Sequence, residues 1–208
     1  MSSQENPRVD GVASAARPSG SQVIALSVVD GEAGRAALDR WQNNMRETGI
    51  DREWRLDCTC TFGGPWGGIR DFFSDLFPQL QMDFPEILNR HCYELNTVVP
   101  ALRRKISVRN SNLTDQAEGE EKVRNYPVDR AYRIVHGLVD VVGALYSKSA
   151  HGGRWLIVAD HFDQAGALNR RFFRELVRRV GPFMNLTLAV VAPVYEAQRV
   201  LDEFRGFA

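Results

Sequence analysis

The sequence predicts an α/β domain in which a mostly parallel sheet lies between two layers of helices. Apolar runs of strand length alternate with segments that repeat apolar residues every three or four positions, and this alternation is typical of a doubly wound sheet. The first run, Val23 to Val29, lacks apolar–polar alternation, which indicates a strand covered on both faces. A length of 208 residues and an apolar content of 44% are those of an ordinary globular domain. We therefore expect a three-layer αβα architecture.

The folded part is expected to follow a flexible tail. Residues 1–21 are rich in Ser, Pro, Gly and Ala, a composition typical of disordered segments. The domain is therefore assigned to residues 22–208, with Val23 to Val29 as its first strand. A turn and a helix over residues 35–48 follow, and the apolar stripe of that helix contains Ala37, Trp41 and Met45. The stripe predicts that Trp41 packs against the central sheet.

Strands and helices continue to alternate along the rest of the chain. Further strands are expected at 53–60, 155–159 and 186–191. Helical segments are expected at 69–80, 84–105, 129–146, 166–180 and 195–204. The polar and charged stretch 107–126 is interpreted as a mobile insertion within the domain.

Composition and charge exclude several functional classes. Lys+Arg and Asp+Glu both total 26, so the chain has no global basic field for nucleic acid. No apolar run approaches the roughly 20 residues of a membrane helix, and the N-terminus lacks the apolar stretch of a signal peptide. The three cysteines form no disulfide-scaffold pattern. These features favour a cytoplasmic protein with no membrane partner.

Five landmarks occur in a recognisable order: the GEAG turn Gly31–Gly34, the helix IRDFFSDLF, the strand WLIVAD ending on Asp160, the helix GALNRRFFRELVRRV and the strand LTLAVV. This order resembles the ATPase core of the AAA-like STAND family of P-loop NTPases. The resemblance covers roughly Val23 to Pro193. It implies a sheet with the strand order 5-1-4-3-2, here without the fifth strand and the helical lid.

The first turn departs from the Walker A loop of working members, GxxxxGK[ST], whose backbone and lysine hold phosphate. The resemblance assigns nucleotide contact, if it persists, to Gly31, Gly34, Arg35, Ala36 and Ala37. Aligned without gaps, Ala37 and Leu38 replace the lysine and the Mg²⁺-binding hydroxyl; with a two-residue deletion, Arg35 lies nearer the phosphates in a shorter loop. Either alignment removes most of the phosphoryl-transfer machinery. A plain turn remains an alternative role for the two glycines.

The strand that ends on Asp160 resembles Walker B, so the resemblance makes Asp160 the candidate Mg²⁺ ligand. The second acid of the family is replaced by His161, and the polar sensor after the next apolar strand is replaced by Ala192-Pro193. His161 could serve as a base near neutral pH or as a structural histidine. Asp160 could equally cap the turn that follows it. Altered residues at all these positions predict that hydrolysis is lost.

Other clusters allow a functional and a structural interpretation. Cys58 and Cys60, with His91-Cys92, form either a metal site or buried free thiols. The loop Gly63–Gly68 carries Trp66 as a structural residue or as an exposed recognition residue. One helix carries five arginines, which form a solvated face or a contact surface for an acidic partner: Arg170, Arg171, Arg174, Arg178 and Arg179.

The leading functional hypothesis is a catalytically inactive NTPase-like domain that acts as a protein-interaction or regulatory module in a larger assembly, with no cofactor. The alternative is a switch that still binds ATP and Mg²⁺ through Arg35 and Asp160. A weaker alternative is a nucleic-acid-associated protein that uses the arginine-rich helix. Without a fifth strand, Val23 to Val29 becomes an unprotected sheet edge, which predicts a homo-oligomer or a protein partner covering it.

Overall fold

The computed structural model describes residues 12–16, 21–28, 31–106, 127–149 and 153–205. In this part of the chain five strands form one sheet in the order β1-β2-β5-β4-β3. Strands β2, β5, β4 and β3 are parallel, and β1 is antiparallel to β2. The strands are β1 (Val12–Ala16), β2 (Gln22–Ser27), β3 (Arg52–Asp57), β4 (Trp155–Asp160) and β5 (Leu186–Ala192). The α/β class and the mostly parallel sheet are confirmed.

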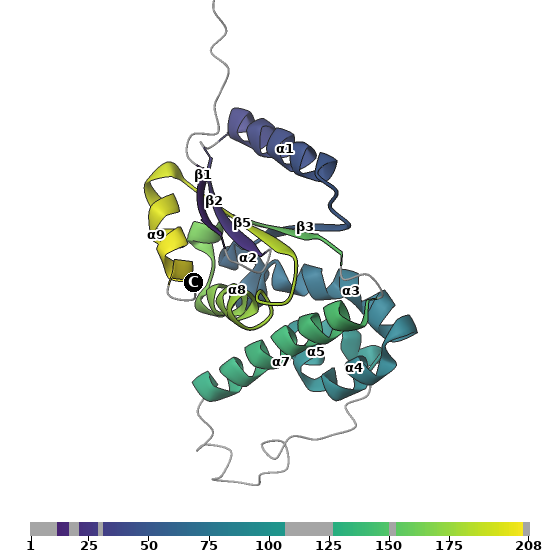
Figure 1. Cartoon of the computed structure of the whole chain (residues 1–208). Helices are drawn as coiled ribbons and strands as arrows, with labels where there is room; N and C mark the ends of the chain where they lie inside the picture. The colour runs from purple at the N-terminus through teal and green to yellow at the C-terminus, as the bar shows by residue number, and fades with distance from the viewer. Residues whose placement is uncertain (1–11, 17–20, 29–30, 107–126, 150–152, 206–208) are drawn as a thin grey trace, which may run out of the picture.

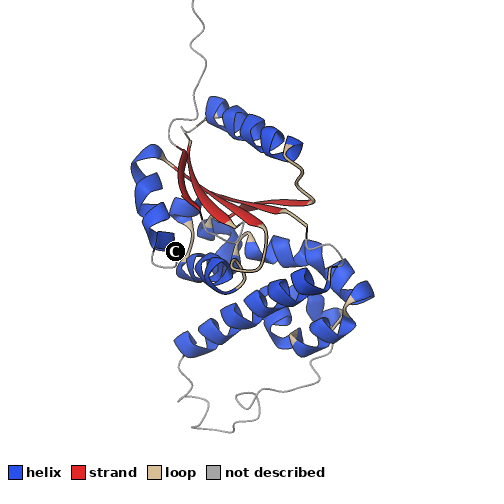
Figure 2. Cartoon of the chain, in the orientation of Figure 1, coloured by secondary structure: helices blue, strands red, loops and turns tan. Residues whose placement is uncertain are grey.

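Helices lie on both faces of the sheet, which gives three layers (Figures 1 and 2). Helix α1 (Glu32–Glu47) covers one face, and the other described helices cover the opposite face. That larger layer contains α2 (Cys60–Gly63), α3 (Ile69–Asp83), α4 (Pro85–Arg90), α5 (Cys92–Val98), α7 (Pro127–Lys148), α8 (Ala167–Arg179) and α9 (Val194–Arg205). Short 3-10 turns are η1 (Gly64–Trp66), η2 (Pro100–Arg104) and η4 (Phe162–Gln164).

The central strands are buried on both faces, as their continuous apolar sequences predict. Along β4, Trp155 and Ile157 pack into the core below α7 and α8, whereas Leu156 and Val158 pack toward α1. All of β5 is buried. Because successive side chains of a strand point to opposite faces, only a strand with helices on both sides can be apolar throughout.

The outer edge of β2 is covered by the chain itself. Strand β1 pairs with it antiparallel, with Val12 opposite Leu26 and Ala16 opposite Gln22. Two expectations are corrected: part of the stretch assigned to a flexible tail forms a strand, and that strand, not a partner chain, covers the edge of β2 from Gln22 to Leu26. The four expected strands do lie in the order 1-4-3-2, and β1 fills the place beside the first of them that was expected to be empty. The expected mobile insertion, 107–126, lies outside the described residues.

Aromatic and polar contacts fix the larger helical layer. Trp54 of β3 contacts Trp155 of β4 and Phe72 of α3, with ring centroids 5.0 Å apart in both pairs. The hydroxyl of Tyr146 on α7 donates to the Gly153 carbonyl at 3.1 Å and accepts from the backbone N–H of Asn185 at 3.0 Å. These bonds tie the end of α7 to the segments that precede β4 and β5.

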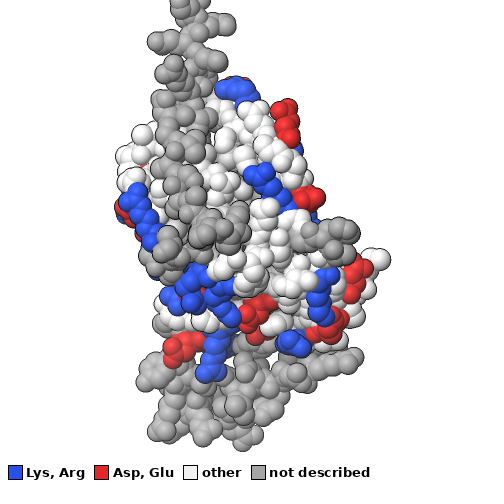
Figure 3. Space-filling view, viewed as in Figure 1, with Lys and Arg blue, Asp and Glu red and all other residues white. Residues whose placement is uncertain are grey.

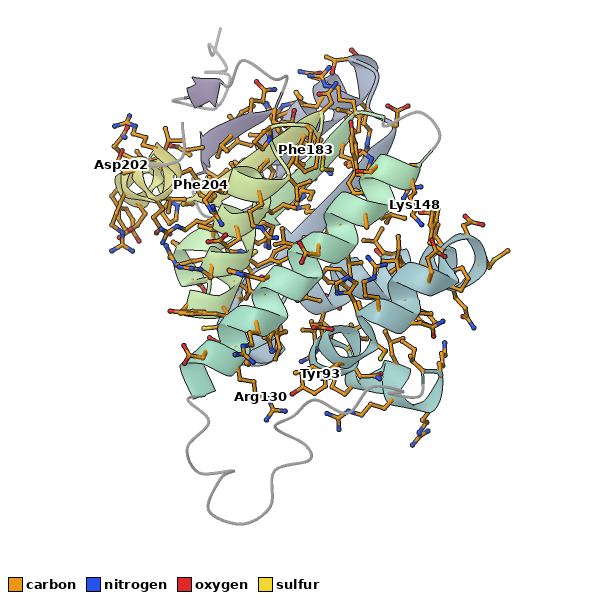
Figure 4. All side chains as sticks on the ribbon, turned by 60° about the horizontal axis from the view of Figure 1, so that its bottom comes forward. Tyr93, Arg130, Lys148, Phe183, Asp202 and Phe204 are labelled. Atoms are coloured by element: carbon orange, nitrogen blue, oxygen red, sulfur yellow. The ribbon has the colours of Figure 1, made fainter. Side chains whose placement is uncertain are left out.

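Both ends of α7 make further contacts with the α4–α5 region. The guanidinium of Arg130 lies 5.5 Å from the centroid of the Tyr93 ring, and the two labelled side chains lie together in Figure 4. At the opposite end of the helix Lys148 pairs with Glu86 of α4. Trp66, in the turn before α3, is only 8% exposed, so the interpretation of this loop as an exposed recognition loop is wrong.

Trp41 packs against the apolar cluster between α1 and the sheet, as predicted, but its side chain is only partly buried. We expect Trp41→Ala to lower the free energy of unfolding by about 2 kcal/mol, less than the roughly 3–5 kcal/mol of a fully buried aromatic. Trp155→Ala supplies the reference, because Trp155 is 1% exposed. Urea denaturation of both variants measures the difference. Equal losses would show that Trp41 is as deeply buried as Trp155.

Candidate functional site

A cavity of about 170 Å³ opens at the carboxyl ends of the parallel strands. In open α/β sheets this edge is where ligands bind, because loops and helix N-termini converge there. Its apolar wall consists of Val28, Leu38, Val191, Ala192 and Pro193. Charged and polar side chains from α1, β3, β4 and η4 line the remainder. The strand order therefore brings residues that are far apart in sequence to one place.

The N-terminus of α1 forms one side of the cavity. Gly31 precedes the helix with φ of 109°, a conformation that glycine adopts without strain, and no side chain caps the helix. Arg35, in the first turn, lines the cavity and is exposed. Of the other residues in this predicted segment, Gly34 and Ala37 are buried and Ala36 is exposed, and none of the three lines the cavity.

Asp160 lies at the cavity as predicted, but a guanidinium already holds its carboxylate. Arg55 of β3 donates to Asp160 Oδ2 from Nε at 3.0 Å and from Nη2 at 2.8 Å. The third contact of Arg55 is from Nη1 to Asp39 Oδ1 of α1 at 2.6 Å. Burial acts to lower the pKa of Arg55, but hydrogen bonds and charge from Asp160 and Asp39 outweigh it and raise that pKa. Arg55 therefore remains cationic, and both of its bonds to Asp160 are made to Oδ2.

His161 follows Asp160 in the left-handed conformation, with φ of 49°. It is the only non-glycine residue of the described chain with a positive φ. Its backbone N–H donates to Asp160 Oδ1 at 3.0 Å, so Asp160 bonds the first residue of the turn, but no side-chain hydrogen bond caps η4 itself. Its ring Nδ1 lies 3.2 Å from Asp57 Oδ1.

Asp57, the partner of that ring, ends β3 directly opposite Asp160 in the strand register. Its carboxylate also accepts the backbone N–H of Thr59 at 3.0 Å. Burial acts to raise the pKa of Asp57, but hydrogen bonds from Thr59 and His161 outweigh it and lower that pKa. Asp57 thus orients the imidazole ring at the cavity.

The cysteines do not form a metal site. Strand β3 ends at Asp57, earlier than expected, so Cys58 and Cys60 do not share one strand face; Cys58 is buried and Cys60 is exposed in α2. Burial, with the nearby charges of Asp57 and Asp160, raises the pKa of the Cys58 thiol. Cys92 is buried elsewhere. Within the described ranges no three His, Cys, Asp or Glu side chains are grouped to hold a metal ion.

The arginines of α8 make contacts within the chain. Arg170 pairs with Glu203 of α9 and also donates to the Phe162, Asp163 and Ala165 carbonyls. Further pairs join Arg171 and Arg178 to Glu175, and Arg179 to Asp140 of α7. Figure 3 shows basic side chains with acidic side chains next to them on the face in view. The pairs of Arg170 and Arg179 join α8 to α9 and α7, whereas those of Arg171 and Arg178 lie within α8.

The sequence did not reveal Arg55, Asp39 or Asp57, nor the lining residues Asp163 and Gln164. An Arg within an otherwise ordinary strand is no signal by itself, because its partners lie 16 and 105 positions away. The alternation of Glu53, Arg55 and Asp57 in the strand REWRLD could have indicated one polar face on β3. That pattern indicates the polar face of β3, but it does not identify the residues that Arg55 bonds.

Comparisons with known proteins assign the chain to no family, so only its structure defines the class of protein. No protein-family model matches the chain, and no curated protein or solved structure shows significant similarity to it. Among the described residues, none of the helices combines the length and apolar character needed to cross a bilayer. The class is therefore an α/β domain with an ionic cavity at the carboxyl edge of its parallel strands.

Gly68, at the start of α3, supports the end of β3 that carries Asp57. It has φ of +63°, and a Cβ there would lie 2.9 Å from the Asp57 carbonyl oxygen. Gly49, after α1, has φ of +85° with nothing within 4 Å of the same position. We expect Gly49→Ala to cost about 1–2 kcal/mol from the left-handed backbone alone. Gly68→Ala should cost at least about 1 kcal/mol more, because the methyl group displaces backbone. Thermal and urea unfolding compare the two; equal losses would contradict the close approach.

Proposed function

We propose that this chain is a catalytically inactive NTPase-like domain that works as a protein-interaction or regulatory module in a larger assembly. The observation that carries the proposal is the Arg55–Asp160 ion pair at the carboxyl edge of the sheet. Asp160 is the residue that the sequence resemblance assigns to Mg²⁺. A carboxylate bonded twice to a guanidinium and once to a backbone N–H has little capacity left for a metal ion.

The fold supports a relation to NTPases. The parallel strands β2, β5, β4 and β3 lie in the order 1-4-3-2 when the four expected strands are numbered along the chain. The cavity lies at the N-terminus of α1, the helix that follows β2. In nucleotide-binding α/β proteins phosphate binds at this position, where backbone N–H groups and the helix dipole favour an anion.

The phosphate-binding side lacks its essential groups. At most four residues, 28–31, separate β2 from α1. Ala37 and Leu38, which replace the lysine and hydroxyl in the ungapped alignment, lie in the second turn of α1, and both are buried against the sheet. The cavity thus receives an apolar side chain where phosphate chemistry requires a cation and a Mg²⁺ ligand.

Arg35 favours a second candidate, a switch that still binds nucleotide. Its guanidinium is exposed at the cavity and, with the uncapped N-terminus of α1, could meet a phosphate. Nucleic-acid binding through α8 is less well supported, because four arginines of that helix are paired with acids of the same chain: Arg170, Arg171, Arg178 and Arg179.

Hydrolysis and nucleotide binding separate these candidates. We expect no ATP turnover above background and no change in melting temperature with 5 mM ATP and Mg²⁺. A ligand present at about 100 times its Kd would stabilise the native state by about 2.7 kcal/mol. Turnover near 1 per second that disappears in Asp160→Asn would overturn the inactive assignment. A nucleotide-dependent rise in melting temperature that Arg35→Ala abolishes would instead establish the switch.

Arg55→Met tests whether the guanidinium blocks a metal site. Removing it frees the carboxylates of Asp160 and Asp39, so we expect measurable Mn²⁺ binding in the variant and none in the unmodified chain. The readout is the electron paramagnetic resonance signal of free Mn²⁺. Arg46→Met is the matched control, since it frees the carboxylate of Glu53. Arg46 Nε lies 2.5 Å from Glu53 Oε2, and neither residue lines the cavity. Equal Mn²⁺ binding by both variants would count against a specific block, and circular dichroism checks that both are folded.

A further inference from the structure

Two Asp and two Arg residues line the cavity, and they fall into two groups. Arg55 and Asp160 are bonded to each other, and Arg55 is also bonded to Asp39. The other two, Arg35 of α1 and Asp163 of η4, make no ion pair within the described residues. The lining therefore offers a ligand one cationic group and one anionic group at the same time.

The cationic group lies at the N-terminus of α1. Gly31 at the N-cap position and Arg35 in the first turn both line the cavity. Because glycine has no side chain to bond the free N–H groups of the first turn, those groups and the positive end of the helix dipole favour an anion. A guanidinium adds donors whose planar arrangement matches a carboxylate. This side of the cavity therefore suits a carboxylate group.

The anionic group lies in η4, the short turn that follows β4. The backbone carbonyl of Asp163 accepts a hydrogen bond from Arg170 Nη2 at 2.8 Å, which holds this turn in place. Asp163 lines the cavity together with Gln164, whose side chain carries a further acceptor oxygen. A primary ammonium group carries donors and no acceptor, so acceptors of this kind match it. This side of the cavity therefore suits an ammonium group.

The remaining wall is apolar, and the cavity is small. The wall consists of Val28, Leu38, Val191, Ala192 and Pro193, and the volume is about 170 Å³. Sites for drug-sized ligands have volumes of roughly 300–1,000 Å³, so this cavity suits a molecule with fewer heavy atoms. A branched aliphatic group would be removed from water against such a wall. Size and lining therefore favour a small ligand with an aliphatic part over a nucleotide.

We propose that the cavity binds a free amino acid with a branched aliphatic side chain. Its carboxylate meets Arg35 and the N-terminus of α1, its ammonium group meets the carboxylate of Asp163, and its side chain lies on the apolar wall. A ligand of one charge would satisfy one of these two groups and leave the other without a partner. This inference goes beyond the proposed function, because it assigns a small-molecule ligand to the domain whether or not the domain is related to NTPases.

The test is an NMR titration of the ¹⁵N-labelled chain with three compounds: L-leucine, isocaproate, which is leucine without its ammonium group, and isoamylamine, which is leucine without its carboxylate. Both analogues are smaller than leucine, so a steric clash cannot weaken their binding. We expect saturable shifts at Arg35, Asp163 and Val191 with leucine, with a Kd below about 1 mM. Each analogue should bind at least about tenfold more weakly, because each leaves one charged group of the cavity without a partner.

Substitutions at the two charged groups should give a crossed pattern. Arg35→Gln and Asp163→Asn should each weaken leucine binding by about tenfold. Arg35→Gln should leave the affinity for isoamylamine unchanged, and Asp163→Asn should leave the affinity for isocaproate unchanged, a pattern that general loss of folding cannot produce. The matched controls are Arg40→Gln on α1 and Asp75→Asn on α3, because both residues are exposed and neither lines the cavity.

Several outcomes would overturn the amino-acid site. They are no saturable shift with leucine, an analogue that binds as tightly as leucine, or equal losses of affinity in Arg35→Gln and Arg40→Gln. Saturable shifts of the cavity residues with Mg²⁺–ATP and none with leucine would make a nucleotide the occupant instead. The inactive-domain proposal is judged separately by ATP turnover and by the melting temperature with Mg²⁺–ATP, so a failure with leucine leaves it unchanged.

Discussion

Arg55 connects α1 to the sheet through ionic contacts. Its guanidinium bonds Asp39 of α1 and Asp160 of β4 at once, so a single side chain of β3 joins the helix to two neighbouring strands. Helix α1 is the only described helix on its face of the sheet, and β3 offers that face polar residues in place of apolar ones. Earlier in the same strand, Glu53 accepts hydrogen bonds from Gln42 and Arg46 of α1. The helix is therefore held by apolar packing over β2, β5 and β4 and by ionic contacts over β3.

In this arrangement the carboxylate of Asp160 has a structural role. Asp160 lies at the end of a buried strand, where an unpaired charge would be costly. Arg55 and the His161 N–H satisfy it, and the latter bond accompanies the left-handed backbone of His161. The turn then directs the chain into η4 and α8, whose Arg170 bonds back to the carbonyls of η4. The ion pair thus shapes the edge of the cavity as well as its charge.

The sequence predicts the features that depend on local pattern. The continuous apolar runs locate β2, β4 and β5, and the turn residues Gly31 and Arg35 and the strand end Asp160-His161 are brought to one cavity. Strand β1 was missed because VASAA consists of small residues without an apolar run, and only its pairing with β2 makes it a strand. Arg55 was missed for a related reason, since its role depends on Asp160, 105 positions away. Trp66 was left open because the glycines around it suit a buried turn and an exposed loop equally.

Replacing Arg55 to free the carboxylate of Asp160 for a cation would also lower the stability of the fold. The side chains of Arg55 and Asp160 are 31% and 15% exposed, so the pair is neither freely solvated nor fully desolvated. Removing one partner of a fully buried pair costs roughly 3–5 kcal/mol, and partial solvation reduces that cost here. The loss would fall on α1 as well, because Asp39 would lose the same guanidinium. Asp39 lies on the helix and Asp160 on the strand, and Arg55 bonds both of them. The attachment of α1 and the occupied carboxylate of Asp160 therefore have the same physical origin.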